Sequence, residues 1–207
     1  MAIVRNVPWW GLASSAAAPA LLAGGWTAAT TLQPPAFDPV ADTVSALAAP
    51  GAADRWVMTL TFLAVGVCDI AAGLALRPAG AAGRLTLVAG SAMGMLVALF
   101  PQHAGGGSPL HALWASIGFA ALAVWPAGAW RRGPRVPWGL RPTVCAVAAG
   151  VLVLLLAWFV AEVLTGTGQA GLAERAVGLA QALWPLTVVL SCRDPVRVRA
   201  GPAPHAA

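Results

Sequence analysis

The sequence predicts an all-α membrane protein, a polytopic bundle of about six transmembrane helices with both termini in the cytoplasm. Three observations predict this class. The chain of 207 residues is 59% hydrophobic and 9% charged, with a mean hydropathy of +0.77, whereas a soluble domain carries about 25% charged residues. Its apolar stretches are each close to the ~20 residues that cross a bilayer. Its arginines occupy alternate connections between those stretches.

The apolar stretches define one transmembrane domain. The first stretch is retained as a span rather than a signal peptide, because its apolar core is too long and Gln33-Pro34-Pro35 is a poor cleavage site. The bundle is expected to occupy residues 1–192, followed by a disordered cytoplasmic tail at 193–207 that is rich in proline, alanine, glycine and arginine. The six spans are expected at residues 9–31, 56–76, 85–101, 109–130, 142–164 and 175–192.

The charge pattern predicts the orientation. Ten of the twelve arginines lie before the first span, in the second and fourth connections, and after the last span, whereas the acids and histidines lie mainly in the other connections. Because positive charge is retained on the cytoplasmic side, we expect cytoplasmic termini, a multi-pass protein of the cell membrane, and any chemistry on the outer face. There is no lysine and no interleaving of aromatic and basic residues, so nucleic acid is not an expected partner despite the net charge of +5.

The connection after the first span predicts a short amphipathic helix on the outer surface. Asp38 and Pro39 form an N-cap and N1 pair. Val40, Val44 and Leu47 then share one helical face, which would pack on the bundle.

The polar residues of this segment admit two interpretations. Asp38 either caps the helix only or belongs to a site. Asp42 and Ser45 lie one turn apart on the same predicted helix, so a site there could use both.

Four short motifs are spread over nearly the whole chain: Phe37-Asp38-Pro39-x-x-Asp42-x-x-Ser45-x-Leu47, Phe100-Pro101, His111 at the start of span four, and Gly171-Leu172-x-Glu174-Arg175. In this order they resemble the domain-of-unknown-function 998 family of small bacterial membrane proteins. The resemblance implies a six-helix bundle and almost no function. The chain departs from the family pattern after the second motif, where an acid is common and His103 stands instead.

Three further acids touch the predicted membrane. Glu162 lies near the C-terminal end of span five, where the helix dipole and partial desolvation disfavour ionisation, so it is expected to serve as a general acid or else to pair with Arg175. Asp69 lies ~12 Å along its helix from Arg77, and is either a functional group or a protonated packing contact. Glu174 opens span six, where the dipole favours its charge.

Metal binding is not expected, and neither is a cofactor. Two histidines and three acids are candidate ligands of a metal site: His103, His111, Asp38, Asp42 and Glu174. However, the spacing of eight residues between the two histidines, across a glycine-rich loop, is not a known ligand spacing. His111 is either a hydrogen-bonded interfacial group or, in a catalytic site, the natural proton acceptor.

Tryptophan provides the last observation, with ten in the chain. Trp26, Trp114 and Trp158 are predicted in the outer half of their spans, where they either fill volume or wall a cavity that stabilises a cation.

Two function classes therefore compete. The first is an integral-membrane enzyme acting on a hydrophobic isoprenoid, similar in size and character to small bacterial membrane-bound terpene cyclases. The second is an accessory, lipid-binding or transport-related bundle. Either way the lipid bilayer is a partner, and the oligomeric state stays open. In the enzyme, Glu162, Asp38 or Asp42 would donate the proton, His111 or a carboxylate would remove the last proton, and the substrate would contact Trp26, Trp114, Trp158, Ser45 and Glu174.

Overall fold

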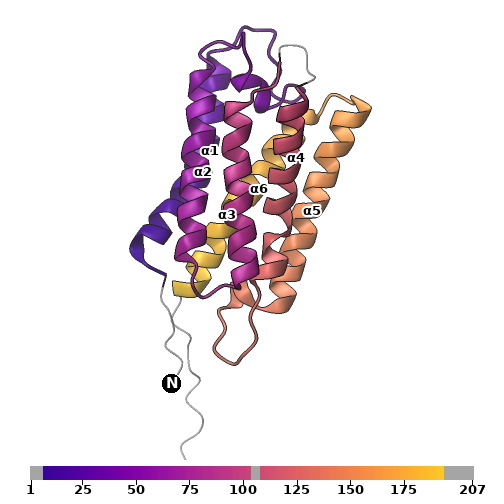
Figure 1. Cartoon of the computed structure of the whole chain (residues 1–207). Coiled ribbons are helices and arrows are strands. Elements are labelled where there is room, and N and C mark those ends of the chain that lie inside the picture. Colours follow the sequence, from indigo (N-terminus) through magenta and orange to yellow (C-terminus); the bar gives the residue numbers. More distant parts are fainter. Residues whose placement is uncertain (1–6, 104–107, 194–207) are drawn as a thin grey trace, which may run out of the picture.

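The chain forms an all-helical bundle in a computed structural model that describes residues 7–103 and 108–193. Within these residues, six α-helices are present, which confirms the predicted fold class (Figure 1). The predicted disordered tail lies outside the described residues, apart from Arg193. The helices are α1 (Trp9–Thr31), α2 (Trp56–Ala75), α3 (Ala81–Leu99), α4 (Pro109–Ala129), α5 (Pro142–Thr165) and α6 (Ala170–Arg193), with two 3₁₀ turns, η1 (Ser45–Ala48) and η2 (Trp138–Leu140).

Five of these helices, α2 to α6, are long and apolar enough to cross a membrane, so the protein is a multi-pass membrane protein. The first helix, α1, has 23 residues and no charge, but it is rich in alanine, glycine, serine and threonine. It packs along α2 and α6, so it runs with the bundle rather than apart from it. Its crossing of the membrane stays a prediction.

The helix ends follow local chemistry. Pro142 is the first residue of α5, where its missing N–H is not needed, and Gly166 ends the helix with a φ of +66°. Ser108 caps α4 by accepting a hydrogen bond from the backbone N–H of His111. The first turn of α3 contains Arg84, whose side chain donates to the carbonyl oxygens of Gly73 and Leu74 at the end of α2.

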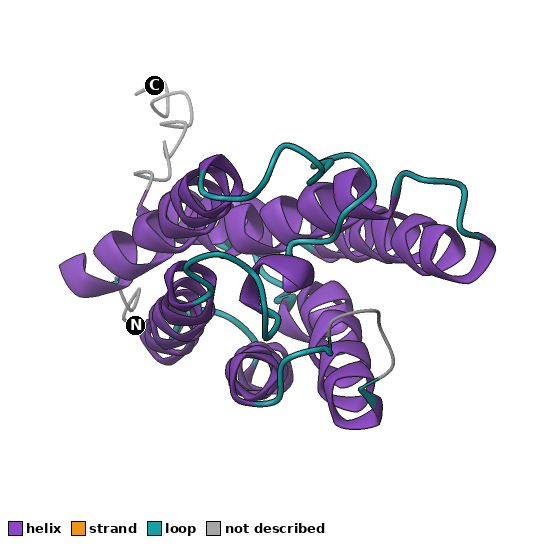
Figure 2. Cartoon of the chain, turned by 90° about the horizontal axis from the view of Figure 1, so that it is seen from above, coloured by secondary structure: helices purple, strands orange, loops and turns teal. Residues whose placement is uncertain are grey.

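Neighbouring helices in the chain are antiparallel neighbours in space. Two layers result, one of α2, α3 and α4 and the other of α1, α6 and α5, with α1 against α2 and α4 against α5 at the edges (Figures 1 and 2). The helices α4 and α5 meet near the bottom of Figure 1 and diverge toward the top.

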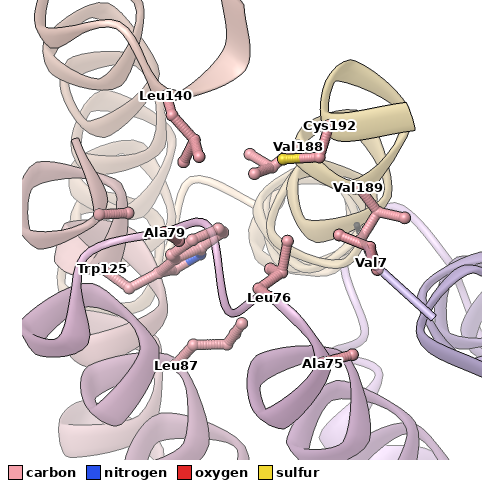
Figure 3. Close-up of a cluster of buried hydrophobic side chains, with 11 residues drawn as sticks. Val7, Ala75, Leu76, Ala79, Leu87, Trp125, Leu140, Val188, Val189 and Cys192 are labelled. Atoms are coloured by element: carbon pink, nitrogen blue, oxygen red, sulfur yellow. The ribbon is translucent and has the colours of Figure 1, made fainter. Parts of the chain in front are cut away.

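The two ends of the bundle differ in charge. At one end, which we call the arginine end, Val7 packs with Val189 and Cys192 in a buried cluster that also contains Trp125 and Leu140 (Figure 3). The start of α1 and the end of α6 therefore lie together, beside the α2–α3 and α4–α5 connections. The opposite end, the acidic end, carries the connections at 32–55 and 166–169 and the described residues of the α3–α4 connection, 100–103 and 108.

The segment after α1 is less helical than the sequence predicts. Asp42 donates its backbone N–H to the carbonyl oxygen of Asp38, and the two side chains accept hydrogen bonds from backbone N–H groups of the same turn. Only the 3₁₀ turn η1 follows. Val44 and Leu47 are buried as expected, but Val40 is 43% exposed. The side-chain bonds of the two aspartates compete with helical bonding, which explains the turn.

Candidate functional site

Glu174, in the first turns of α6, connects this helix to the segment after α1. Its side chain is 5% exposed. One carboxylate oxygen accepts the backbone N–H groups of Val44 and Ser45, and the other accepts the Ser45 hydroxyl at 2.7 Å. Burying a carboxylate is costly unless donors surround it, and these three donors meet that requirement.

The neighbouring Arg175 holds the preceding turn. Its Nη1 donates to the carbonyl oxygens of Pro39 at 2.8 Å and Asp42 at 3.0 Å, and to that of Gly171 in its own helix. The turn also lies so close to α6 that a Cβ at Gly171 would collide with the carbonyl oxygens of Pro39 and Asp42. Arg175 is thus directed to backbone carbonyl groups and not to Glu162, contrary to the pairing considered from the sequence.

The α3–α4 connection completes this end of the bundle. The Nδ1 of His111 lies 3.1 Å from the carbonyl oxygen of Phe100, which can only accept, so Nδ1 carries the hydrogen. Gln102 donates to the Thr43 hydroxyl at 3.3 Å. The four motifs that resemble the family are therefore assembled at the acidic end.

A groove of about 560 Å³ opens between α4 and α5 near the acidic end. Phe119 of α4 and Phe159 of α5 both line it and contact each other, with ring centroids 5.5 Å apart. His111 lies along its wall, and Ser45 and Glu174 lie at its inner side. The groove thus has mostly apolar walls and a polar inner margin.

A smaller, partly enclosed space of about 110 Å³, which we call the internal cavity, adjoins the groove. The two spaces share four lining residues: Ser45, Ala115, Phe119 and Glu174. From there the cavity extends between α2, α3, α4 and α6 to Asp69, which lies 13 residues, or ~20 Å, along α2 from Trp56. It is much larger than the roughly 10–15 Å³ that one water needs.

Two polar groups that line this cavity lack partners. Asp69 is 4% exposed, and its Oδ1 has no hydrogen-bond partner among residues 7–103 and 108–193. The same holds for the Nε1 of Trp114. Buried polar groups in folded proteins are usually paired, so these two atoms mark a place where a bound group would be stabilised.

Two other polar residues of the cavity were missed by the sequence reasoning. Ser91 and Gln181 donate hydrogen bonds to the carbonyl oxygens of Leu87 and Phe119, respectively. Their position inside apolar spans was the available signal, but serine and glutamine are tolerated in such helices for many reasons.

Glu162 is not brought to either cavity. Its carboxylate accepts hydrogen bonds from Trp158 at 3.2 Å, from the backbone N–H of Gln169 at 3.1 Å and from Thr167. It lines neither the groove nor the internal cavity. The expectation that Glu162 protonates a bound molecule therefore lacks geometric support.

Most of the other nominated residues are also dispersed. Asp38 is exposed and Asp42 half-buried, and both are engaged in their own turn. Trp26 packs on a separate buried cluster and Trp158 bonds to Glu162, so of the three tryptophans Trp114 alone lines the described cavities. Ser45, Glu174 and His111 are brought together. Among the described residues, no group of three or more histidine, cysteine or acidic side chains is arranged to hold a metal ion.

Comparison with known proteins gives one match. A family model described as "Protein of unknown function (DUF998)" matches residues 15–191. No curated protein and no solved structure matches the chain.

Proposed function

Since the chain belongs to DUF998, a family of proteins of unknown function, we propose from its own geometry that it binds a lipidic molecule inside the cell membrane. The observation that carries this proposal is that the α4–α5 groove adjoins an internal cavity. An isoprenoid is one candidate for the bound molecule.

The walls of the groove suit a hydrocarbon chain. The α5 side is built from Leu156, Phe159, Val160, Val163 and Leu164. Val163 and Leu164 are 57% and 80% exposed, so this wall continues into the surface that faces the bilayer. A ligand pocket is typically apolar with few polar groups that fix orientation. Here the polar groups lie at the inner side of the groove and in the internal cavity that adjoins it.

Lipid that copurifies with the protein tests the proposal. Ala115 lines both spaces, so phenylalanine at this position would narrow the passage between them. Ala120 lies on the same helix, is exposed and lines neither space. We expect the parent and Ala120→Phe, purified in detergent, to retain a lipid that mass spectrometry detects, and Ala115→Phe to retain about tenfold less. Equal lipid in the two variants would reject the proposal.

A second candidate function is cyclisation of an isoprenoid. The observation that favours it is that an acid, Asp69, and the aromatic rings of Phe62, Trp114 and Phe119 line the same cavity. An acid can protonate an alkene or epoxide, and aromatic faces stabilise the cation that forms. Asp69 takes the place of Glu162 in this mechanism.

The test of this candidate is turnover. Parent protein incubated with an epoxidised linear isoprenoid is expected to give cyclic product, detected by gas chromatography and mass spectrometry. Asp69→Asn keeps the shape and removes the acid, so the rate should fall by ~10²–10⁴-fold. Absence of cyclic product from the parent would leave lipid binding as the function.

A further inference from the structure

Acidic side chains line the internal cavity both where it adjoins the groove and at its deep end. Asp69 and Glu174 both line the cavity, and among the described residues no arginine or histidine does. Glu174 is already satisfied by backbone and hydroxyl donors. Asp69 has an oxygen without a donor.

Two other polar side chains that line the cavity can accept hydrogen bonds as well. Ser91 donates its single hydroxyl hydrogen to the carbonyl oxygen of Leu87, and Gln181 donates one of its two amide hydrogens to that of Phe119. This leaves lone pairs on the Ser91 hydroxyl and the side-chain carbonyl oxygen of Gln181 for a bound group. Because Asp69 Oδ1 has no donor within the described part of the chain, a bound group that carries several hydrogens would satisfy it and these lone pairs together.

The charge of the lining residues indicates which kind of hydrogen-bond donor would bind here. An acid within a membrane is paired with a cation, neutralised, or part of a pathway. A phosphate would meet two carboxyl groups and no cationic side chain, which is unfavourable in a low dielectric. An ammonium group carries three N–H donors and the complementary charge, and charge-assisted hydrogen bonds are stronger than neutral ones.

The residues that line the cavity favour an organic cation over an inorganic one. The side chains of Asp69, Ser91 and Gln181 hold four oxygens together, fewer than the six to eight that calcium takes. Phe62, Trp114 and Phe119 line the rest of the space, and aromatic faces attract organic cations. We infer that the bound molecule is a lipophilic amine whose ammonium group contacts Asp69, Ser91 and Gln181 and whose hydrocarbon chain runs out through the α4–α5 groove. This inference rests on the proposed binding of a lipidic molecule.

Three probes with one hydrocarbon chain test it: geranylgeranyl amine, geranylgeraniol and geranylgeranyl phosphate. Each competes at pH 7 for the purified protein in detergent, and native mass spectrometry measures the bound fraction. We expect the amine to bind at least tenfold more tightly than the alcohol, and the phosphate to bind most weakly. Asp69→Asn should weaken amine binding about 10- to 100-fold and leave alcohol binding within about twofold.

The outcomes separate this inference from the proposed function. If the alcohol binds as tightly as the amine, or if Asp69→Asn weakens all probes equally, the ammonium assignment is rejected and lipid binding stands. If no probe binds to the parent and Ala115→Phe retains as much lipid as Ala120→Phe, both are rejected. Thermal unfolding of Asp69→Asn shows whether the variant is folded, and Ser91→Ala supplies a second, smaller change at the same end of the cavity.

Discussion

At the scale of single residues, one substitution can fill the internal cavity without displacing the other residues that line it. Gly94 of α3 lines the cavity, and a Cβ built on it meets no atom within 4 Å. We expect Gly94→Leu to place its side chain in this space and to lower retained lipid about tenfold. The fold should persist, because leucine is a better helix former than glycine.

Gly150 provides the matched control. It lies on α5, is exposed, and also has open space around its Cβ position. Gly150→Leu makes the same gain in helix propensity outside the cavity, so retained lipid should equal that of the parent. Equal losses in the two glycine variants, measured by mass spectrometry of extracted lipid, would show that the cavity is not where lipid binds.

Glu174 gives a second prediction at this scale. In Glu174→Gln one carboxylate oxygen becomes an NH₂ group, which faces the donors of Val44 and Ser45 or of the Ser45 hydroxyl. We expect the free energy of unfolding to fall by about 1–3 kcal/mol, seen as a lower Tm in detergent. Glu162→Gln is the control, because water can replace its exposed partners. A larger drop in Tm for Glu162→Gln would contradict the buried role of Glu174.

The sequence identified these residues unevenly, for a physical reason. Asp69 stood out because a charge deep in an apolar span is costly. Glu174 and Ser45 were both nominated, but their contact joins residues 129 positions apart, which no local pattern encodes. The sequence showed how far along its helix Glu162 lies. It did not show the direction of the Glu162 side chain, because that direction depends on the conformation of the following loop.

At the scale of elements, the spans were predictable because length and hydropathy are local properties. The predicted limits of α4 and α5 are within one residue of the structure. The starts of α3 and α6 were placed four and five residues too late, at the charged residues Arg84 and Glu174–Arg175. Those charges lie inside the helices, because Arg84 bonds to the end of α2 and Glu174 and Arg175 bond to the turn after α1.

The contact between that turn and α6 predicts an effect of one methyl group. Gly171→Ala would push the carbonyl oxygens of Pro39 and Asp42 away from α6. We expect faster amide hydrogen exchange or proteolysis across residues 38–48, because the Arg175 and Glu174 bonds would loosen with it. Gly178→Ala on the same helix is the control, since a Cβ there makes only an ordinary 3.8 Å contact with Leu22. Unchanged exchange in Gly171→Ala would contradict the close packing.

At the scale of the whole molecule, charge asymmetry predicts orientation. The first and last described residues share the arginine end with Arg77, Arg131, Arg132, Arg135 and Arg141, whereas Arg55 and Arg175 lie at the acidic end. Positive charge is retained in the cytoplasm. We therefore expect the arginine end inside and the acidic end outside.

Cysteine labelling checks the orientation. In a chain whose Cys68, Cys145 and Cys192 have been replaced, Asp54→Cys and Thr167→Cys should react with a membrane-impermeant maleimide added to intact cells. Gly133→Cys should react only after the membrane is opened. The reverse pattern would place the groove in the cytoplasmic leaflet, and labelling of Asp54→Cys and Thr167→Cys on opposite sides would contradict the bundle itself.

The position of the groove also determines how binding must be measured. The acidic end is covered by the segment that Glu174 and Arg175 hold in place, and the groove opens sideways between α4 and α5. A ligand that enters by this route comes from the lipid phase, so occupancy depends on its mole fraction in the bilayer. Adding buffer to a fixed amount of membrane would then leave occupancy of the site unchanged. Adding vesicles that contain no ligand would lower occupancy, because ligand would exchange into them.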